Sequence, residues 1–255
     1  MPHTSIDGEP VFTAFSDGGE AGDLILVHGS GGDHSHWPEQ LLQLPGVRVH
    51  GIDLPGHGMS GGQARDSVDA YADVVAGLVE ALKSQPKTVV AGHSLGGAIA
   101  LTLALRQPDW LSGIILVGTG ARLRVAPAIL DGLLGDDPGA AVDTLTDMAF
   151  GPGAPDEAVE RIRSGWHRID PRVTHADLSA CDRFDVMDRL AEIRIPALVI
   201  AGTKDRLTPL KYGQYLHEHI PDSRLAVIEG AGHNMALERP AEIVSEVAGF
   251  FRALR

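Results

Sequence analysis

Three residues have the types and the order needed to activate a hydroxyl group: Ser94, Asp205 and His233. A serine hydroxyl is a weak nucleophile at neutral pH, and it needs a neutral imidazole to take its proton. The imidazole in turn needs a carboxylate that fixes its tautomer and stabilises its protonated form. Each of the three residues follows an apolar segment typical of a buried strand, and the carboxyl ends of parallel strands meet at one edge of a sheet. We therefore expect Ser94 to be a nucleophile, His233 its base and Asp205 the group that orients the base.

Ser94 lies in the segment GHSLGG, residues 92–97. This segment follows an apolar run at 88–91 and precedes a helix-like run at 98–105. The order strand, Gly-x-Ser-x-Gly, helix is typical of a nucleophile elbow, a sharp turn that exposes a serine hydroxyl at a helix N-terminus. A chain with 31 glycines can contain this spacing by coincidence, but the flanking strand and helix favour the elbow.

Acyl transfer also needs two hydrogen-bond donors for the oxyanion that forms at the carbonyl group. The backbone N–H of Leu95, directly after the serine, is one candidate. The other is the backbone N–H of Ser30, in a glycine-rich loop at 28–33 that follows the apolar run at 24–27. Such a loop can present N–H groups to a developing charge, although in isolation it is also compatible with a flexible turn.

Asp205 and His233 also have purely structural interpretations. Asp205 could cap the helix predicted to begin at Pro209, and His233 could be an ordinary loop histidine. The order serine, aspartate, histidine, with each residue placed after a strand, favours the catalytic interpretation.

The segments around these residues alternate between buried strands and amphipathic helices. Continuous apolar runs predict strands that are buried on both faces, and recurrence at i, i+3, i+4 and i+7 predicts helices. This alternation predicts an α/β fold with a mostly parallel sheet of about eight strands, flanked by helices on both faces. The predicted strands are residues 9–15, 24–27, 47–54, 88–91, 113–118, 197–202 and 224–228, and the predicted helices are residues 37–44, 67–84, 98–105, 209–220 and 240–254.

Residues 121–195 have a different character, with four helical segments and no buried strand; the segments are 127–134, 140–148, 156–168 and 170–181. We expect a helical cap, or lid, inserted between two late strands, with residues 1–120 and 196–255 forming the core. A cap there would lie over the carboxyl ends of the strands, and its apolar side chains would either line a substrate pocket or pack the cap itself. The candidate pocket residues, in the cap and around the serine, are Gly29, Trp37, His93, Met148, Phe150, Trp166 and Asn234.

Composition limits the partners. The chain has 255 residues and a net charge of −13, which disfavours nucleic acid and anionic membrane surfaces as partners. Cys181 is the single cysteine, so an internal disulfide is excluded and a reducing cytoplasm is the simplest location. We expect no targeting or membrane segment, because no stretch reaches the roughly 20 apolar residues of a membrane helix. His34 and His36 lack the further ligands of a metal site, so we expect no metal and no cofactor, and the sequence is compatible with either a monomer or a homodimer.

With these residues in place, the sequence resembles the α/β-hydrolase superfamily, and in particular the compact bacterial serine hydrolases with a helical cap. The resemblance covers essentially the whole chain. It implies the α/β-hydrolase fold and a serine triad formed by the three residues above. The matching segments are residues 28–29 (HG), 53–60 (DLPGHGMS), 92–97 (GHSLGG), 202–205 (GTKD), 232–233 (GH) and 238–240 (ERP).

The same motifs separate this chain from several branches of the superfamily. Haloalkane dehalogenases and soluble epoxide hydrolases carry an aspartate where this chain has Ser94. Perhydrolase and haloperoxidase-type members usually have Phe-Pro or a similar pair where this chain has Ser30 and Gly31. Carbon–carbon hydrolases of ring-cleavage products favour Asn before the serine and Trp after the histidine, where this chain has His93 and Asn234.

The resemblance therefore implies hydrolysis of a carboxylic ester of a small to medium substrate, through an acyl-enzyme on Ser94. Enol-lactone, thioester and carbon–carbon bond hydrolysis are alternatives on the same triad. An alternative of another class is a receptor-like protein that binds a ligand on a hydrolase scaffold.

Overall fold

The computed structural model describes residues 3–83 and 87–254, and within them eight strands form a single sheet. The strands are β1 (His3–Ile6), β2 (Glu9–Asp17), β3 (Asp23–Val27), β4 (Arg48–Ile52), β5 (Thr88–His93), β6 (Leu111–Val117), β7 (Ala197–Gly202) and β8 (Ser223–Ile228). Their order across the sheet is β1-β2-β4-β3-β5-β6-β7-β8. The β1–β2 and β2–β4 pairs are antiparallel and all other neighbours are parallel. The predicted fold class, a mostly parallel sheet of about eight strands, is confirmed.

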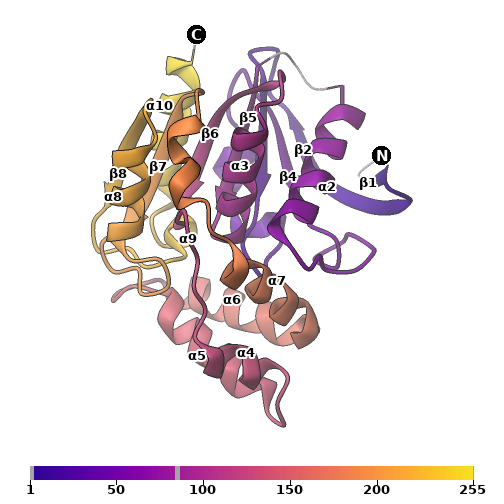
Figure 1. The fold of residues 1–255 in the computed structure, drawn as a ribbon, viewed down its shortest axis with the longest axis vertical. Helices are drawn as coiled ribbons and strands as arrows, with labels where there is room; N and C mark the ends of the chain where they lie inside the picture. Colours follow the sequence, from indigo (N-terminus) through magenta and orange to yellow (C-terminus); the bar gives the residue numbers. More distant parts are fainter. Residues whose placement is uncertain (1–2, 84–86, 255) are drawn as a thin grey trace.

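Helices cover both faces of this sheet (Figure 1). Those that pack on it are α1 (Glu39–Leu42), α2 (Val68–Ala81), α3 (Leu95–Arg106), α8 (Leu210–His219) and α10 (Pro240–Ala253). The apolar cluster on one face contains residues of α2, α3 and α8, and the cluster on the other contains residues of α1 and α10. Side chains alternate between the faces along a strand, so that Ile25 and Val27 of β3 join the first cluster and Leu24 and Leu26 the second. A strand covered on both faces must be apolar throughout, which explains why continuous apolar runs predicted these strands.

The start of α2 follows a capping signal in the sequence. Ser67 is the N-cap, and its side chain accepts a hydrogen bond from the N–H of Ala70 (3.2 Å). The apolar stripe of the helix, which includes Tyr71, Val75 and Leu78, is buried against the sheet. The predicted last residue of this helix, at 84, lies outside the described residues.

Four helices lie between β6 and β7: α4 (Pro127–Leu133), α5 (Pro138–Ala149), α6 (Asp156–Arg168) and α7 (Pro171–Arg183). In Figure 1 they form a layer beyond one end of the sheet, at the bottom of the view. They share an apolar cluster of their own, to which α5 contributes Leu145 and α6 contributes Ile162 and Trp166. The chain then returns to the core through a 3-10 helix, Met187–Glu192, in which Leu190 is buried. We refer to α4–α7 as the helical layer.

A buried carboxylate connects the helical layer to the loops and the helix that pack next to the sheet. Asp177 of α7 accepts hydrogen bonds from the N–H of Gly31 (3.0 Å), from Nε2 of His57 (2.8 Å) and from the hydroxyl of Tyr71 (2.5 Å). Both Asp177 and the His57 side chain are fully buried. Burial by itself would raise the pKa of the Asp177 carboxyl, but the attraction of His57 and the three hydrogen bonds outweigh it and lower the pKa below 3.8. Asp177 is therefore an ionised group at the junction of α7 with the glycine-rich loop.

His57 carries the balancing charge. Its Nε2 faces Asp177, and its Nδ1 lies 3.0 Å from the carbonyl oxygen of Pro55. Both neighbours can only accept hydrogen bonds, so both ring nitrogens must carry protons. Burial lowers the pKa of His57, but Asp177 and the carbonyl group raise it by more, to above 6.5. The junction is thus a buried ion pair.

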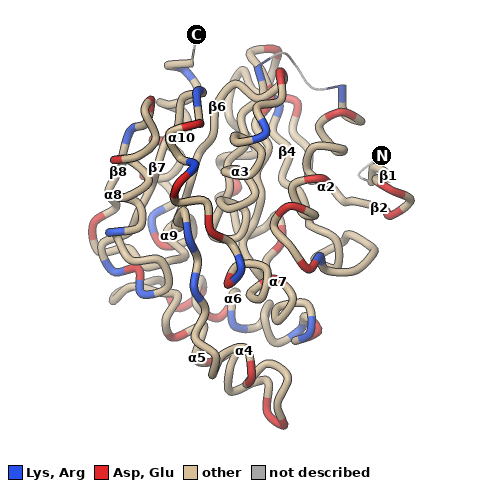
Figure 2. Tube along the Cα trace, in the orientation of Figure 1, with Lys and Arg blue, Asp and Glu red and all other residues tan. Residues whose placement is uncertain are grey.

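The surface carries charges of both signs, interspersed over helices and loops (Figure 2). No helix among the described residues is long and apolar enough to cross a membrane.

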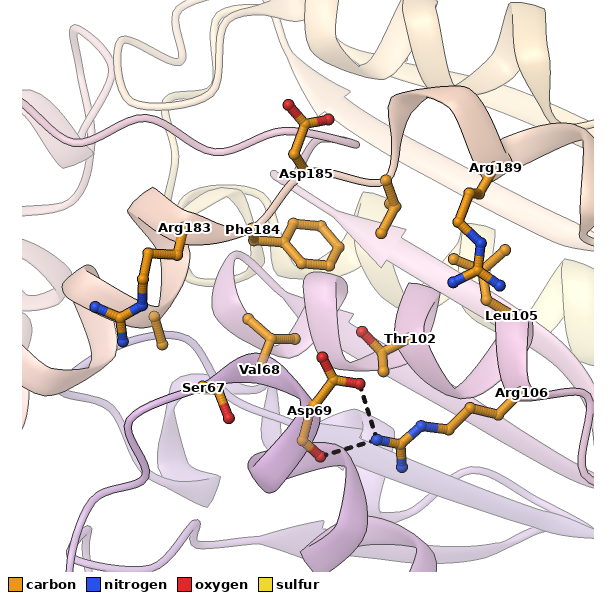
Figure 3. A pocket seen from close by; sticks show the side chains of 12 residues that line it. Ser67, Val68, Asp69, Thr102, Leu105, Arg106, Arg183, Phe184, Asp185 and Arg189 are labelled. Carbon is orange, nitrogen blue, oxygen red and sulfur yellow. Dashed lines mark hydrogen bonds and ion pairs between the residues drawn. The ribbon is translucent and has the colours of Figure 1, made fainter.

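A groove of about 350 Å³ lies between α2, the C-terminal half of α3 and α7 (Figure 3). Its arginines are already engaged: Arg106 donates to Asp69 and Asp73, and Arg183 donates to the carbonyl oxygen of Asp66. The predicted nucleophile precedes the N-terminus of α3, at the opposite end of that helix. We therefore assign no catalytic role to this groove.

Replacing Asp177 by Asn should weaken the junction in a pH-dependent way. The change removes one partner of a buried ion pair, which costs about 3–5 kcal/mol. The lowered pKa of Asp177 gives stability that is present above the ordinary carboxyl pKa of 3.8 and is lost as pH falls through the folded value. The raised pKa of His57 gives stability that is complete below 6.5 and is lost as pH rises through the folded value. The difference in unfolding free energy between wild type and Asp177→Asn should therefore be largest between about pH 4 and pH 6.5.

The measurement is urea unfolding of both proteins at a series of pH values. Asp136→Asn, at an exposed position of the helical layer, is the control and should change the stability little at any pH. A stability difference that stays constant from pH 4 to pH 9 would contradict the ion pair.

Candidate active site

Ser94 occupies a strained turn between β5 and α3, where it is the N-cap of the helix. Its backbone has φ +54° and ψ −114°, a conformation that a residue with a side chain keeps only when its surroundings enforce it. Two close backbone approaches do so. A Cβ added to Gly92 would collide with the carbonyl oxygen of Gly96, and one added to Gly96 would collide with that of Val27. Thr119 Oγ1 also donates to the Ser94 carbonyl oxygen (2.9 Å), which fixes the backbone of the turn.

His233 and Asp205 are joined through Nδ1 of the imidazole and Oδ2 of the carboxylate, at 2.9 Å. Thr208 Oγ1 donates to the same oxygen (2.8 Å), and Oδ1 accepts from the N–H groups of Leu207 (2.9 Å) and Thr208 (2.8 Å). Burial would raise the pKa of the Asp205 carboxyl, but His233 and these hydrogen bonds lower it below 3.8. Asp205 is therefore ionised at neutral pH, and it holds the proton of neutral His233 on Nδ1. The Nε2 atom of that tautomer is left as a proton acceptor.

His93, the residue before the serine, contacts both the backbone and the ring of His233. Its Nε2 donates to the carbonyl oxygen of His233 (3.0 Å), and the two ring centroids are 4.7 Å apart. Burial lowers the pKa of His93 to about 3, so the ring is neutral. Because a carbonyl oxygen can only accept, the single proton of His93 must be on Nε2. His93 is thus a positioning residue for the backbone that carries His233.

A buried glutamate also holds the loop that contains His233. Glu238, in α9 (Met235–Glu238), accepts from the N–H groups of Gly232 (3.0 Å) and Gly151 (3.0 Å). Gly151 comes just after α5, so this carboxylate ties the histidine loop to the helical layer.

The glycine-rich loop at 28–33 has a fixed conformation rather than that of a flexible turn. His28 Nε2 accepts from the N–H of Leu54 (3.0 Å), so its proton is on Nδ1, which donates to the Gly29 carbonyl oxygen (2.7 Å). Burial lowers the pKa of His28 to about 4, which keeps the ring neutral. At the other end of the loop, the N–H of Gly31 is held by Asp177.

Ser30 and Leu95, the predicted oxyanion donors, both lie next to Ser94. Ser30 lines a cavity together with Ser94. Leu95 is the first residue of α3, where a backbone N–H has no acceptor within its own helix. Ser30 and Leu95 therefore lie on the side of the sheet where Ser94 is found, and their role as oxyanion donors stays a prediction.

Two cavities lie over Ser94 and His233. The smaller measures about 40 Å³ and the larger about 220 Å³. Residues that line both are Ser94, Leu145, Leu178, Leu207 and His233. The further side chains around the smaller cavity are mostly polar, namely Ser30, His36, His93, Trp166, Thr174 and Asn234. Those around the larger cavity are mostly apolar and include Leu123, Val125, Ile129 and Met148, together with Arg124 and Arg206. We call these the small polar chamber and the large apolar chamber.

The predicted pocket residues are divided between these chambers and other parts of the molecule. Gly29, His93, Trp166 and Asn234 line the small polar chamber, and Met148 lines the large apolar chamber. The structure corrects two expectations. Trp37 is 3% exposed and packs in the apolar cluster between α1 and the sheet, away from both chambers. Phe150 packs in the cluster of the helical layer and borders a separate surface hollow with Gly151 and Pro152. From the sequence alone, an aromatic residue that packs in a core cannot be distinguished from one that lines a pocket.

Three residues around the site were not predicted from the sequence. Thr208 supports Asp205, Asp177 holds the glycine-rich loop, and His36 lines the small polar chamber. Asp177 had a readable signal, because it falls at helical spacing with Thr174 and Cys181 on the buried face of α7. A carboxylate on the buried face of a helix must have partners.

One group of side chains has the composition of a metal site. Ligand atoms of Asp33, His34 and Asp53 all lie within 4.8 Å of one another. These atoms already have protein partners: Asp53 Oδ1 accepts from Nδ1 (2.8 Å) and N–H (2.7 Å) of His34, and Asp33 Oδ1 accepts from the N–H of Ser35 (2.7 Å). Asp53 Oδ2 also accepts from the N–H of Met59 (2.8 Å). We therefore assign the group to the structure of the loops.

Comparison with known proteins places this geometry in a family. The chain matches the model of the alpha/beta hydrolase family over residues 24–246. It is 32% identical over 225 residues to the pimeloyl-[acyl-carrier protein] methyl ester esterase of Neisseria meningitidis serogroup C, an alignment that covers 82% of this chain and 86% of that protein.

Similar solved structures agree with this family assignment. A thermophilic esterase is 40% identical, with a TM-score of 0.86 over 99% of this chain and 97% of that one. The enol-lactonase from Burkholderia xenovorans LB400 is 25% identical, with a TM-score of 0.88 over 98% of this chain and 100% of that one. The chain therefore belongs to the alpha/beta hydrolase family, as a hydrolase of the carboxylesterase type.

Proposed function

We propose that the protein hydrolyses a carboxylic ester through an acyl-enzyme on Ser94. The observation that carries this proposal is the strained elbow at Ser94, next to a histidine whose Nδ1 is held by a buried, ionised Asp205. In the proposed reaction His233 Nε2 takes the proton of the Ser94 hydroxyl as its oxygen attacks the ester carbonyl. The oxyanion accepts hydrogen bonds from the N–H groups of Ser30 and Leu95.

Collapse of this tetrahedral intermediate breaks the carbon–oxygen bond to the alcohol. His233 gives its proton to the leaving alkoxide oxygen, and the acyl group remains on Ser94. A water molecule then attacks the acyl-enzyme, His233 takes one of its protons, and collapse releases the acid and returns the proton to Ser94. Asp205 stays ionised and stabilises the imidazolium in both halves of the reaction.

The two chambers indicate the shape of the substrate. We propose that the large apolar chamber takes the longer, apolar arm of a small to medium ester and that the small polar chamber takes the shorter arm. Residues 121–195, which supply walls to both chambers, then act as the lid that selects the substrate. The named activity of the relative from Neisseria, hydrolysis of a methyl ester, fits a substrate with one long and one short arm.

A lactone is a second candidate substrate, because a lactone carbonyl is attacked in the same way. The similarity to the enol-lactonase, and to a structure described as an N-acyl homoserine lactone degrading enzyme at 27% identity and a TM-score of 0.85, favours including it. Rates for aryl esters of increasing acyl length, compared with a lactone, a thioester and a vinylogous diketone, separate these substrate classes.

Ser94→Ala should reduce ester hydrolysis to the background rate while leaving the fold intact, because the substitution removes only the attacking oxygen. Circular dichroism should be unchanged, and a fluorophosphonate probe should label wild type on Ser94 and leave the variant unlabelled. Ser245→Ala, at an exposed position on α10, is the matched control and should keep wild-type activity and labelling. Hydrolysis that persists in Ser94→Ala would refute the mechanism, and wild type that is not labelled would favour a ligand-binding protein.

Asp205→Asn should lower kcat by about four orders of magnitude with little change in KM, because the amide favours the wrong tautomer of His233 and cannot stabilise the imidazolium. Steady-state kinetics on one aryl ester measure both constants. Asp222→Asn, an exposed residue before β8, is the control and should behave as wild type. A loss of less than tenfold in kcat would assign Asp205 to the structure of its loop alone.

A further inference from the structure

Four of the residues that line the small polar chamber carry a buried polar atom that has no hydrogen-bond partner in the structure: Ser30 Oγ, Trp166 Nε1, Thr174 Oγ1 and Asn234 Nδ2. They are half of the eight such atoms found within residues 3–83 and 87–254. Trp166, Thr174 and Asn234 are only 8%, 2% and 4% exposed. Buried donors are normally paired, so their concentration in one cavity indicates that the partner is a bound molecule.

The four atoms come from separate parts of the fold and converge on the glycine-rich loop. Ser30 belongs to that loop, Trp166 to α6 and Thr174 to α7, and Asn234 follows the histidine of the triad. The point where a Cβ of Gly31 would lie is 2.9 Å from Trp166 Nε1 and 3.3 Å from Thr174 Oγ1. Both donors therefore lie close to Gly31, where a larger residue would collide with them.

The chemistry of the four groups selects a hydrogen-bond acceptor. The indole N–H of Trp166 and the amide NH₂ of Asn234 can only donate, and the hydroxyls of Ser30 and Thr174 can donate as well. An oxygen atom with free lone pairs satisfies all four types of group. A donor such as an ammonium group would leave the indole and the amide unpaired.

The chamber also favours an uncharged group. No Asp, Glu, Lys or Arg lines it. Burial lowers the pKa of His36 to about 4 and that of His93 to about 3, so both imidazoles are neutral at pH 7. A carboxylate or phosphate would therefore enter without a counter-charge, which is costly in a buried site.

We propose that the small polar chamber is a specificity subsite for a compact, uncharged substituent with an acceptor oxygen, of the ether, hydroxyl or ketone class, next to the scissile ester. The proposal rests on the proposed function, because the subsite is defined relative to Ser94. Its volume of about 40 Å³ admits one or two ordered waters in the free protein or a short substituent in the complex. Such an oxygen replaces the water and accepts hydrogen bonds through its lone pairs from the donors that reach it, whereas a methylene group accepts none.

Two pairs of isosteric esters test this proposal on the two sides of the scissile bond. On the acyl side, p-nitrophenyl methoxyacetate is compared with p-nitrophenyl butanoate. On the alcohol side, 2-methoxyethyl hexanoate is compared with butyl hexanoate. Each pair differs by an oxygen in place of a methylene group. The measured quantity is the ratio of kcat/KM within a pair, and comparing this ratio between proteins cancels the intrinsic reactivity of the esters.

Two substitutions remove a donor: Thr174→Val does so at almost constant volume, and Trp166→Phe does so with the loss of part of the ring. Each has a matched control elsewhere in the fold, because Trp37 Nε1 and Thr13 Oγ1 are also buried and unpaired but lie away from both chambers. Trp37→Phe and Thr13→Val thus reproduce the chemical change outside the subsite. Neither Trp166→Phe nor Thr174→Val removes a hydrogen bond within the protein. Trp166→Phe also removes packing in the apolar cluster of the helical layer, a loss that Trp37→Phe reproduces in another cluster, and circular dichroism checks that each variant is folded.

In one of the two series, wild type should favour the oxygen-bearing ester, and Trp166→Phe and Thr174→Val should each reduce that preference about five- to tenfold. The series in which this happens identifies the side of the ester that enters the chamber. The two control variants should retain the wild-type ratio. Ratios that are unchanged by Trp166→Phe and Thr174→Val in both series would overturn the subsite and leave a chamber that holds only water.

A binding measurement separates failure of the subsite from failure of the proposed function. The intact esters are titrated into Ser94→Ala and into Ser94→Ala with Thr174→Val, and their affinities are measured by calorimetry. Tighter binding of the oxygen-bearing ester that is lost with Thr174→Val supports the subsite even if wild type hydrolyses none of the esters. Equal binding of both esters of each pair to Ser94→Ala overturns it.

Discussion

The close approach of three backbone segments at the elbow is the constraint on which the rest of the structure depends. β5 runs directly into α3, and α3 packs so closely on the end of β3 that neither Gly92 nor Gly96 can carry a Cβ. The turn between them forces Ser94 to a positive φ, a strain of about 1–3 kcal/mol. The burial of α3 along its length stabilises this arrangement, because residues 95–105 are all buried. In this conformation the Ser94 side chain makes no capping hydrogen bond to the helix.

The protein contains two buried Asp–His pairs that differ in one respect. His57 has acceptors at both ring nitrogens, Asp177 and a carbonyl oxygen, so its geometry favours the doubly protonated ring. His233 has the carboxylate of Asp205 at Nδ1, and its ring borders the chambers that Ser94 also lines. The same two side-chain types therefore form a structural ion pair in one place and the proposed proton acceptor in the other. What differs is the partner of the second nitrogen.

The fold was largely predictable because a strand covered on both faces leaves a continuous apolar run, and the observed β3, β5, β6 and β7 all coincide with such runs. The edge strand β8 is only partly buried. The meeting of Asp205 with His233 was also readable, since strand ends in a parallel sheet lie at one edge. Thr208 was missed, because a threonine three residues after an aspartate signals an ordinary turn. Trp37 was misplaced for a similar reason, since its hydrophobic side chain suits a core and a pocket equally.

The substrate is harder to predict from the sequence than the reaction, and the reason is physical. Each of the proposed triad residues lies in a turn after a strand, where the local sequence determines the backbone conformation and the direction of the side chain. The unpaired donors of Trp166 and Thr174 come from two helices whose relative placement depends on packing in the helical layer and on the junction at Asp177. That junction also holds Gly31, beside the proposed oxyanion donor. One buried carboxylate thus contacts both the helical layer and the glycine-rich loop, so the substrate selection and the oxyanion binding that we propose would share a single support.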